Sequence, residues 1–411
     1  MLGQIAAVCS VLLFLWALVG SLRALFRQSG MVQMIVPAHR ATRQDDLRIL
    51  AWVLGTSVVI YAIGMLTVVL NGQGGSFAQT FEQAFFKADA LHYMNIAENG
   101  YTAVGESRYF IVFFPLFPWL TRAFSVLTLG NMVLAACLLN TILLALACMV
   151  MFRIGILDFD RASVHRAVQY LLVFPVAFFW HNPYSEPLFF FLSALSLYYA
   201  RTHRWWQAGL AGFLCALTRA TGVLCAIPLV LEAFYVAKQS GRLRFGQWVK
   251  MAVWSALAPL GTVCYLVLNY VVTGNAFMFL IHQKEHWSNG FQLFPHAVDT
   301  VVERMVTNQT PTHAALWISQ SLAIFFFLFL MVMGVKRLRP SMNLYNCAYF
   351  LMMISSSWLL SGPRYLMAMF PAFYVLGAIT HDRLRHGVTL GLLSAGLVVM
   401  TLCFAAGHAI Y

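Results

Sequence analysis

Apolar residues occur along the chain in long, nearly uninterrupted runs that are separated by polar segments. Five runs hold about 20 residues each: 5–26, 49–70, 251–272, 314–335 and 387–406. As a helix, a run of this length crosses the hydrocarbon core of a bilayer, which is about 30 Å thick. Lipid offers the backbone no hydrogen-bond partner, so each run must pair its amides internally, as a helix does. The pattern therefore predicts an all-α polytopic membrane protein.

Further apolar runs lie between these five and enlarge the predicted bundle. They fall near 131–152, 166–180, 187–200, 342–360 and 365–380. No repeat, low-complexity tract or soluble domain separates them. We therefore predict one transmembrane domain over 1–411, built from roughly 11–12 spanning helices.

Composition agrees with this membrane class. Hydrophobic residues make up 61% of the 411 residues and charged residues 10%, against about 45–50% and about 25% in soluble globular proteins. All eight cysteines lie inside apolar runs, and none forms a CxxC pair. The sequence therefore supports neither a disulfide framework nor a structural zinc site, and we predict no metal site.

Positive charge is distributed unevenly among the linkers. One set of alternate linkers holds 19 of the 26 Lys and Arg residues with 6 acidic residues, whereas the other set holds 7 basic and 8 acidic residues. Cytoplasmic loops are rich in Lys and Arg, so the first set is predicted to lie inside and the second outside. The basic residues are scattered between apolar runs and not gathered on one soluble face, which argues against nucleic-acid binding.

This orientation assigns the remaining segments. Segment 5–48 is predicted to be an additional N-terminal helix and a basic inner loop, because a cleaved signal peptide has its charge before the apolar run. Segments 71–130 and 273–312 become outer loops. Segment 207–236 has basic residues at both ends, so we predict a re-entrant hairpin that turns outward, where Gly222 suits the turn.

The densest set of polar residues lies in 85–101, within the first outer loop. Its apolar positions recur at helical spacing, which predicts an amphipathic helix along the outer interface. On that helix Asp89, His92 and Tyr93 share one face, because they are three and four residues apart. We take them as candidate catalytic residues. The alternative is that Asp89 and His92 are only the solvated edge of the helix.

Two other outer segments carry candidate substrate-binding residues. In 109–118 two prolines three residues apart interrupt any helix and leave a bent aromatic backbone, so Phe113 and Phe114 either line an isoprenoid site or only pack. A later turn carries Asn182 and Glu186. The Glu186 carboxylate either contacts a sugar or a basic partner, or caps the next helix.

Two arginines are candidate phosphate ligands. Arg219 lies within the apolar hairpin, where an unpaired cation is costly. Arg364 is a second outer cation at a predicted helix start, and two arginines around one phosphate would give charge-assisted, bidentate contacts. The alternative is a structural ion pair of Arg219 with Asp89 or Glu186.

The last candidate residues lie in the second outer loop, at 281–287. His282 and His286 are four residues apart, and the string matches the H-x-x-E-H pattern of one class of metallopeptidases. No soluble catalytic domain surrounds them. We therefore favour contact of His282, Lys284 and Trp287 with sugar or phosphate over metal binding.

Together these blocks resemble the PIG-V family of membrane mannosyltransferases, which add the second mannose in glycosylphosphatidylinositol assembly and have bacterial relatives. Residues 87–101 are similar to its W-D-x-x-H-[FY]-x-x-I-A-x-x-G-Y block, and 113–118 to its F-F-P-L-[YF]-P element. Later blocks follow in the same order at 182–186, 218–222, 282–287 and 363–365. Lys87 departs from the family, which often has Trp there. The resemblance covers about 80–375 and favours a bacterial member, because the longer loops of eukaryotic members are missing.

The resemblance implies a GT-C-like fold and a glycosyltransferase of EC 2.4.1 type. Such an enzyme moves a hexose, mannose in the family, from a polyprenyl-phosphate sugar to a lipid-linked or glycan acceptor. Asp89 would be the general base of an inverting displacement, with His92 and Tyr93 orienting it or the acceptor. Arg219 and Arg364 would bind the donor phosphate. Arginines can stabilise the leaving phosphate without a metal, so we expect no obligatory cofactor, and a divalent metal is compatible with the site.

A flippase or transporter of lipid-linked sugars is the alternative from another class. It explains the spans and Arg219 equally well, but it needs polar cavities open to both sides, and the inner linkers are mostly basic. We predict an enzyme of a bacterial plasma membrane, or of the endoplasmic reticulum if eukaryotic, with its active site on the extracytoplasmic side. Its expected partners are the donor, the acceptor and membrane lipids.

Overall fold

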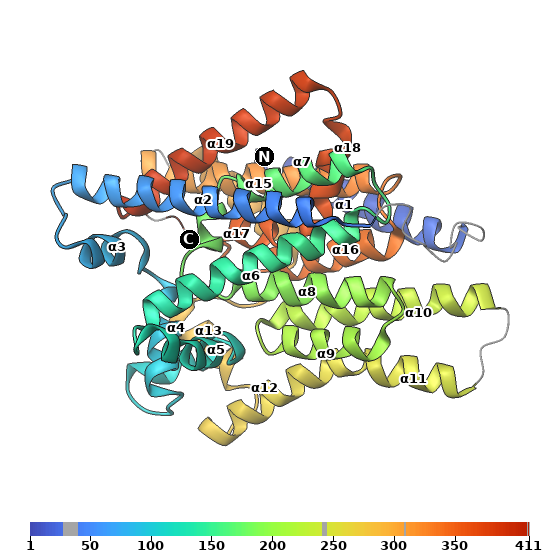
Figure 1. Cartoon of the computed structure of the whole chain (residues 1–411), viewed down its shortest axis with the longest axis horizontal. Helices are drawn as coiled ribbons and strands as arrows, with labels where there is room; N and C mark the ends of the chain where they lie inside the picture. Colours follow the sequence, from blue (N-terminus) through green and yellow to red (C-terminus); the bar gives the residue numbers. More distant parts are fainter. Residues whose placement is uncertain (28–39, 241–244, 308–309, 409, 411) are drawn as a thin grey trace.

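The structure is a computed structural model that describes residues 1–27, 40–240, 245–307, 310–408 and 410. Within these residues it is a bundle of helices without a β-strand (Figure 1). Residues 28–39 of the predicted inner loop and 308–309 of the predicted outer loop lie outside the described residues.

The α-helices are α1 (Leu2–Arg27), α2 (Arg43–Leu70), α3 (Phe77–Phe85), α4 (Asp89–Asn99), α5 (Leu116–Phe124), α6 (Met132–Gly155), α7 (Arg161–Leu172), α8 (Glu186–Arg201), α9 (Trp205–Ala216), α10 (Ala226–Ser240), α11 (Phe245–Ser255), α12 (Leu257–Thr273), α13 (Met278–Trp287), α14 (Phe294–Thr307), α15 (Pro311–Gly334), α16 (Pro340–Ile354), α17 (Gly362–Met367), α18 (Phe370–Ile379) and α19 (Arg383–Ala405). Four 3-10 helices join them: η1 (Glu106–Val112), η2 (Ser125–Thr128), η3 (Ala177–Trp180) and η4 (Ala220–Cys225).

Seven helical segments of the described chain are long and apolar enough to span a bilayer. They are α1, α2, α6, Ala220–Lys238, Phe245–Thr273, Leu316–Gly334 and α19. An eighth span would join η1 to Leu116–Thr128, a pair bent by 108°. Large apolar side chains cover their outer faces, for example Val58, Val271 and Leu392, which are 67%, 74% and 69% exposed. Lipid is the environment that accepts such a surface, so the predicted all-α polytopic membrane protein is confirmed.

Fewer helices reach spanning length than the 11–12 predicted. The predicted crossings near 166–180, 187–200, 342–360 and 365–380 are formed by α7, α8, α16, α17 and α18, which have 6 to 16 residues each. In the first of these crossings α7 ends at Leu172 and η3 begins at Ala177. Pro175 lies between them, and a proline cannot continue a helix. These short helices form the core: every residue from 370 to 377 in α18 is buried.

Ion pairs join several helix ends at one end of the bundle. Arg201, at the end of α8, pairs with Asp158 at 2.7 Å and lies 3.9 Å from Glu232 of α10. Glu232 also pairs with Arg339, directly before α16, at 2.6 Å. Buried charges are tolerated when they are paired in this way. We call this end, where α8 and α10 end and α16 begins, the basic end.

The chain reverses between α9 and α10, within the predicted hairpin 207–236. Arg219 is extended, with φ −157° and ψ 153°, between the end of α9 and the start of η4. Gly222 lies against the backbone of Cys215, where a Cβ would clash. α9 has 12 residues, whereas Ala220–Lys238 is of spanning length. Whether the hairpin enters and leaves the bilayer on the same side depends on the position of the membrane, so its re-entrant character stays a prediction.

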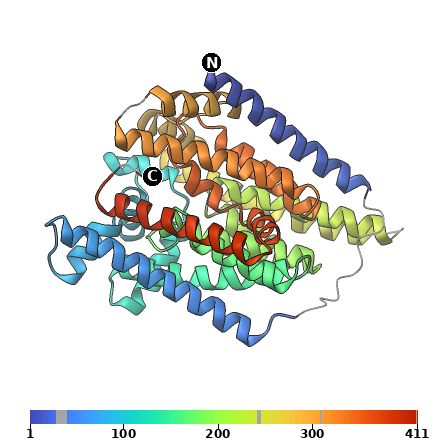
Figure 2. The same ribbon diagram turned by 90° about the horizontal axis from the view of Figure 1, so that it is seen from above.

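The helices α1 and α2 lie on opposite edges of the bundle (Figure 2). α1 packs on α14, α15 and α16, and α2 packs on α3, α6 and α19. At the basic end, the Lys238 ammonium donates a hydrogen bond to the Phe26 carbonyl at 3.0 Å, which fixes the end of α1 near the end of α10. The additional N-terminal helix is therefore a peripheral member of the bundle.

Candidate active site

A strained turn sets the position of Asp89, the first residue of α4. The preceding Ala88 has φ +49° and ψ −125°, a conformation that residues with a side chain rarely adopt and that costs about 1–3 kcal/mol. Lys87 holds the turn from both sides. Its ammonium donates to the last two carbonyl groups of α19 at 3.1 and 2.8 Å, and its own carbonyl accepts from the Tyr184 hydroxyl at 2.8 Å. The lysine that departs from the family pattern therefore caps the C-terminal helix.

Four charged side chains from distant parts of the sequence form one hydrogen-bonded unit. Arg364 donates from Nη1 to Asp89 Oδ2 at 2.7 Å and from Nε to Glu186 Oε1 at 2.5 Å. Arg219 donates from Nη1 to the same Glu186 oxygen at 2.5 Å. The unit combines two carboxylates and two guanidinium groups, so its formal charge is zero. We call Asp89, Glu186, Arg219 and Arg364 the four-charge cluster.

Exposure differs strongly within this cluster. The side chains of Glu186 and Arg364 are 1% and 4% exposed, Arg219 is 15% exposed, and Asp89 is 28% exposed. Within the described residues Asp89 Oδ1 accepts no hydrogen bond, and buried Glu186 Oε2 also has no partner. Asp89 is therefore the member that an incoming molecule reaches first, with one oxygen unoccupied.

Two alternatives from the sequence are decided by this geometry. Arg219 does form the ion pair with Glu186 that the sequence left open, and Arg364 forms a second one. Glu186 is the first residue of α8, but its carboxylate contacts the arginines and no side chain caps that helix. The interpretation of Asp89 as a solvated helix edge is wrong, because its carboxylate pairs with a buried arginine.

Tyr93 lies one turn after Asp89 on α4 and is linked to the four-charge cluster through Ser185. Its hydroxyl is hydrogen-bonded to Ser185 Oγ at 2.8 Å, and Ser185 Oγ in turn lies 3.5 Å from Arg219 Nη1. The ring packs against Phe113, with the ring centres 5.0 Å apart. Burial raises the pKa of the Tyr93 hydroxyl well above its usual value. The hydroxyl is therefore protonated near neutral pH and available as a hydrogen-bond donor.

His92 faces an aromatic wall and forms no hydrogen bond with Asp89 in the described chain. Its ring centre lies 4.4 Å from that of Phe110, 5.1 Å from that of Phe113 and 6.1 Å from that of Trp287. Burial lowers the pKa of His92, although the nearby Asp89 charge acts in the opposite direction. The imidazole is therefore neutral near pH 7. The structure thus brings the predicted residues Phe113 and Trp287 together beside α4.

His282 and Lys284 lie on α13, further from the cluster. His282 is buried, with its ring edge toward Tyr109 at 5.0 Å between centres, and burial lowers the pKa of His282. The His286 ring stacks on the ring of Tyr109, with the ring centres 4.3 Å apart. Lys284 is exposed. Among the described residues no three metal-ligating side chains converge, here or elsewhere.

Phe114 is held by a stacking contact and Asn182 by a hydrogen bond to its carbonyl. Phe114 stacks on Tyr265 at 3.8 Å between ring centres, away from Phe113. The carbonyl of Asn182 accepts from Asn140 Nδ2 at 2.5 Å, whereas its own buried amide has no partner within the described chain. Within the described residues, the Asn182 side chain therefore forms no hydrogen bond with the four-charge cluster.

The sequence interpretation missed the aromatic rings that surround the arginines. The Arg364 guanidinium lies 4.4 Å from the ring centre of Tyr184 and 4.9 Å from that of Phe179. The Arg219 guanidinium lies 5.4 Å from that of Tyr365. Cation–π contacts of this kind help to stabilise a buried cation. Tyr184 and Tyr365 lie inside blocks that carried the family resemblance, whereas nothing in the sequence singled out Phe179.

No protein-family model matches the chain, and no curated protein matches it. Several solved structures are similar in fold. ArnT from Cupriavidus metallidurans in the apo state gives a TM-score of 0.47 at 14% identity over 77% of this chain and 71% of that one. ArnT bound to undecaprenyl phosphate gives 0.47 at 17% identity, over 81% and 60% of the two chains.

The third similar structure is the archaeal oligosaccharyltransferase AglB from Archaeoglobus fulgidus, in complex with an inhibitory peptide and a dolichol-phosphate. It gives a TM-score of 0.43 at 13% identity, over 88% of this chain and 56% of that one. The chain thus spans little more than half the length of that protein. Likeness at these scores and identities assigns no activity to the chain.

Proposed function

We propose that the protein is a GT-C-type glycosyltransferase that moves a hexose from a polyprenyl-phosphate sugar to the hydroxyl of a lipid-linked or glycan acceptor, with inversion. The four-charge cluster carries this proposal. Transfer to a hydroxyl requires a base for the departing proton and positive charge beside the leaving phosphate. Asp89 is a partly exposed carboxylate with an unoccupied oxygen, and it is hydrogen-bonded to Arg364, which shares Glu186 with Arg219.

In the proposed step, Asp89 Oδ1 accepts the proton of the acceptor hydroxyl while the hydroxyl oxygen attacks the anomeric carbon. The bond between that carbon and the phosphate oxygen breaks, and its electron pair leaves with the polyprenyl phosphate anion. Arg219 and Arg364 exchange their contacts with Glu186 for phosphate oxygens, which accept bidentate, charge-assisted hydrogen bonds. The arginines supply the charge that the leaving group needs, so a metal is not obligatory.

The neighbouring residues position the reactants. The protonated Tyr93 hydroxyl and the neutral His92 imidazole lie on the same helix as Asp89, where they orient the carboxylate or the acceptor. Phe113 and Trp287 beside His92 offer aromatic faces to a sugar ring or an isoprenoid chain. Sugar or phosphate contacts of Asn182, Phe114, His282 and Lys284 stay predictions.

The finer parts of the proposal rest on the sequence. Mannose as the transferred sugar and membership of the PIG-V family come from the resemblance of the sequence blocks. The extracytoplasmic position of the site comes from the distribution of Lys and Arg among the linkers.

A transfer assay with a matched variant tests the proposal. The protein in lipid nanodiscs is incubated with radiolabelled polyprenyl-phosphomannose and a lipid extract of its own host. Asp89→Asn should lower transfer of label by about 10²–10⁴-fold, the usual contribution of a general base. Glu98→Gln removes an exposed carboxylate from the same helix and should leave transfer unchanged. If Asp89→Asn transfers label as fast as wild type, Asp89 is not the general base.

The same preparation distinguishes the transporter. A flippase would move the donor across the bilayer unchanged, and Asp89→Asn would make no difference. At the basic end Arg201, Glu232 and Arg339 are occupied by one another and by Asp158, which favours a site open on one side over a path open to both.

A further inference from the structure

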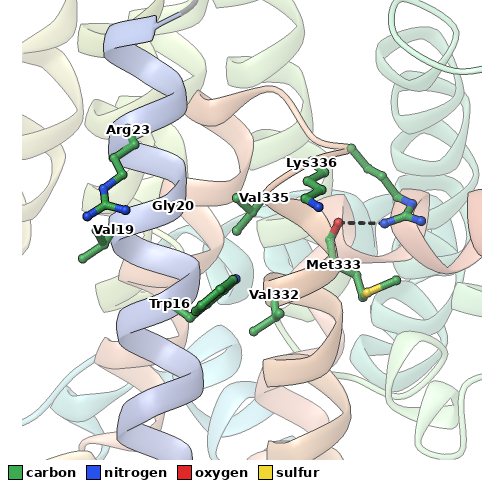
Figure 3. Close-up of a pocket in the computed structure, with 9 residues that line it drawn as sticks. Trp16, Val19, Gly20, Arg23, Val332, Met333, Val335 and Lys336 are labelled. Atoms are coloured by element: carbon green, nitrogen blue, oxygen red, sulfur yellow. Dashed lines mark hydrogen bonds between the residues drawn. The ribbon is translucent and has the colours of Figure 1, made fainter.

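A groove of about 540 Å³ lies between α1 and α15, away from the four-charge cluster. Its lining is largely apolar, with Trp16 and Val19 on α1, Val332 on α15 and Val335 directly after α15. In Figure 3 the ring of Trp16 reaches from α1 toward Val332. Gly20 brings the two helices close, because a Cβ there would overlap Val335. The groove is thus an elongated apolar surface between two lipid-facing helices.

One end of the groove is lined by three cations, Arg23, Lys336 and Arg337. Arg23 and Lys336 lie at a similar height in Figure 3, with Arg23 on the side of α1 away from Lys336, and both are exposed. The Arg337 guanidinium donates a hydrogen bond to the Met333 carbonyl, at 3.3 Å. None of the three has an acidic partner in the described chain, in contrast to Arg201 and its neighbours at the same end. The three side chains therefore place a formal charge of +3 beside the apolar groove, without an acidic residue of the described chain paired to it.

The groove is distinct from the candidate active site. Gln320 of α15 accepts a hydrogen bond from the Gly362 amide at 2.8 Å, two residues before Arg364. From Gln320 to the end of α15 at Gly334 the helix rises about 21 Å, at about 1.5 Å per residue. The cations therefore lie most of a bilayer thickness from the cluster.

We propose that this groove binds an anionic phospholipid, with its headgroup at the cationic end of the groove and an acyl chain along Trp16 and Val332. The groove is largely apolar and carries cations at one end. It therefore matches a lipid that has apolar acyl chains and an anionic headgroup. Basic pockets between membrane helices bind acidic headgroups, and each Lys or Arg near the headgroup contributes about fivefold in affinity. Zwitterionic lipids lack the net negative charge that the three cations require.

Native mass spectrometry of the full chain tests this site. The protein is loaded with phosphatidylglycerol or with phosphatidylcholine of the same acyl chains, and the bound lipid is titrated. Wild type should retain one phosphatidylglycerol in preference to phosphatidylcholine, and the double variant Arg23→Gln/Lys336→Gln should bind it about 25-fold more weakly. Val19→Phe, which fills the groove without changing charge, should also weaken binding.

Arg383→Gln is the matched control. It removes an exposed cation at the start of α19, a helix that packs on α2 and α7. It should leave the tight phosphatidylglycerol in place. Equal retention of the two lipids by wild type would overturn the proposal, as would a loss in Arg383→Gln as large as that in the double variant. Retention by Val19→Phe equal to wild type would show that the lipid lies outside the groove and would overturn it as well.

Discussion

Glu186→Gln perturbs the four-charge cluster at its centre. The Oε1 atom of Glu186 accepts hydrogen bonds from Arg364 and Arg219 at 2.5 Å each, and the three side chains are 1%, 4% and 15% exposed. Water therefore cannot replace the lost negative charge. Removing one partner of a buried ion pair costs about 3–5 kcal/mol. Glutamine keeps one acceptor oxygen and Asp89 still pairs with Arg364, so we expect a loss of about 3 kcal/mol in the free energy of unfolding.

Reversible unfolding in mixed micelles measures this loss. The exposed Glu98→Gln should stay within about 0.5 kcal/mol of wild type. Adding Arg219→Gln to Glu186→Gln should recover part of the loss, because it removes one of the two cations left with a deficit of negative charge. An unfolding free energy of Glu186→Gln equal to that of wild type would refute the reasoning, since it would mean that water already compensates the arginines.

Binding of the proposed leaving group extends the same experiment. If Arg219 and Arg364 exchange Glu186 for phosphate, added polyprenyl phosphate should stabilise Glu186→Gln more than it stabilises wild type. The variant presents its arginines without a competing carboxylate, so its affinity for the anion is higher, and stabilisation grows with the ratio of ligand concentration to Kd. Equal stabilisation of the two proteins would argue against arginines as the phosphate ligands.

Three further predictions concern α4 and its start. Ala88→Gly should raise the free energy of unfolding by up to about 1 kcal/mol, because glycine adopts φ near +49° without strain, whereas Ala88→Val should lower it; identical melting temperatures would contradict this. Lys87→Met should cost about 1–3 kcal/mol and increase hydrogen exchange at the end of α19, which loses two hydrogen bonds to its last carbonyls; unchanged exchange there would contradict the cap. Burial lowers the pKa of His92 in the folded protein, so this residue's contribution is complete above about pH 6.5 and is lost as the pH falls toward the folded pKa. His92→Phe should therefore lose less melting temperature than wild type between pH 7.5 and 5.5, and an equal loss would contradict the assignment.

Local signals in the sequence predicted the helix that carries Asp89. Most of the apolar positions at helical spacing between 85 and 97 turn inward: Phe85, Ala90, Tyr93 and Met94 are buried, whereas Phe86 is partly buried. The helix begins later than predicted, at Asp89, because the chain makes a separate strained turn after α3. Helical periodicity carries no information about such a turn, and alanine is not a residue that suggests a positive φ.

The partners of the charged residues followed from the sequence only as alternatives. The cost of a buried cation predicted that Arg219 needs an anion, and it named Glu186 among the candidates. It could not predict that one carboxylate oxygen serves both Arg219 and Arg364, which come from segments 145 positions apart in the sequence. Likewise, the bond from Lys87 to the end of α19 joins residues separated by more than 300 positions. Contacts of this kind depend on how the helices pack, which hydropathy and spacing do not specify.

Hydropathy also overestimated the number of full-length helices, since it does not distinguish a side chain buried in protein from one that faces lipid. The helix α18 shows what this means for the assembly of the protein in a membrane. With 10 residues it is about 15 Å long, half the thickness of the hydrocarbon core, so it cannot cross a bilayer as an independent unit. It packs along α7, and Arg166 of α7 donates a hydrogen bond to the Gly377 carbonyl near the end of α18 at 2.9 Å. Insertion of this part of the chain is therefore inseparable from its folding, and a truncated chain that lacks α7 should be unable to hold α18 in the membrane.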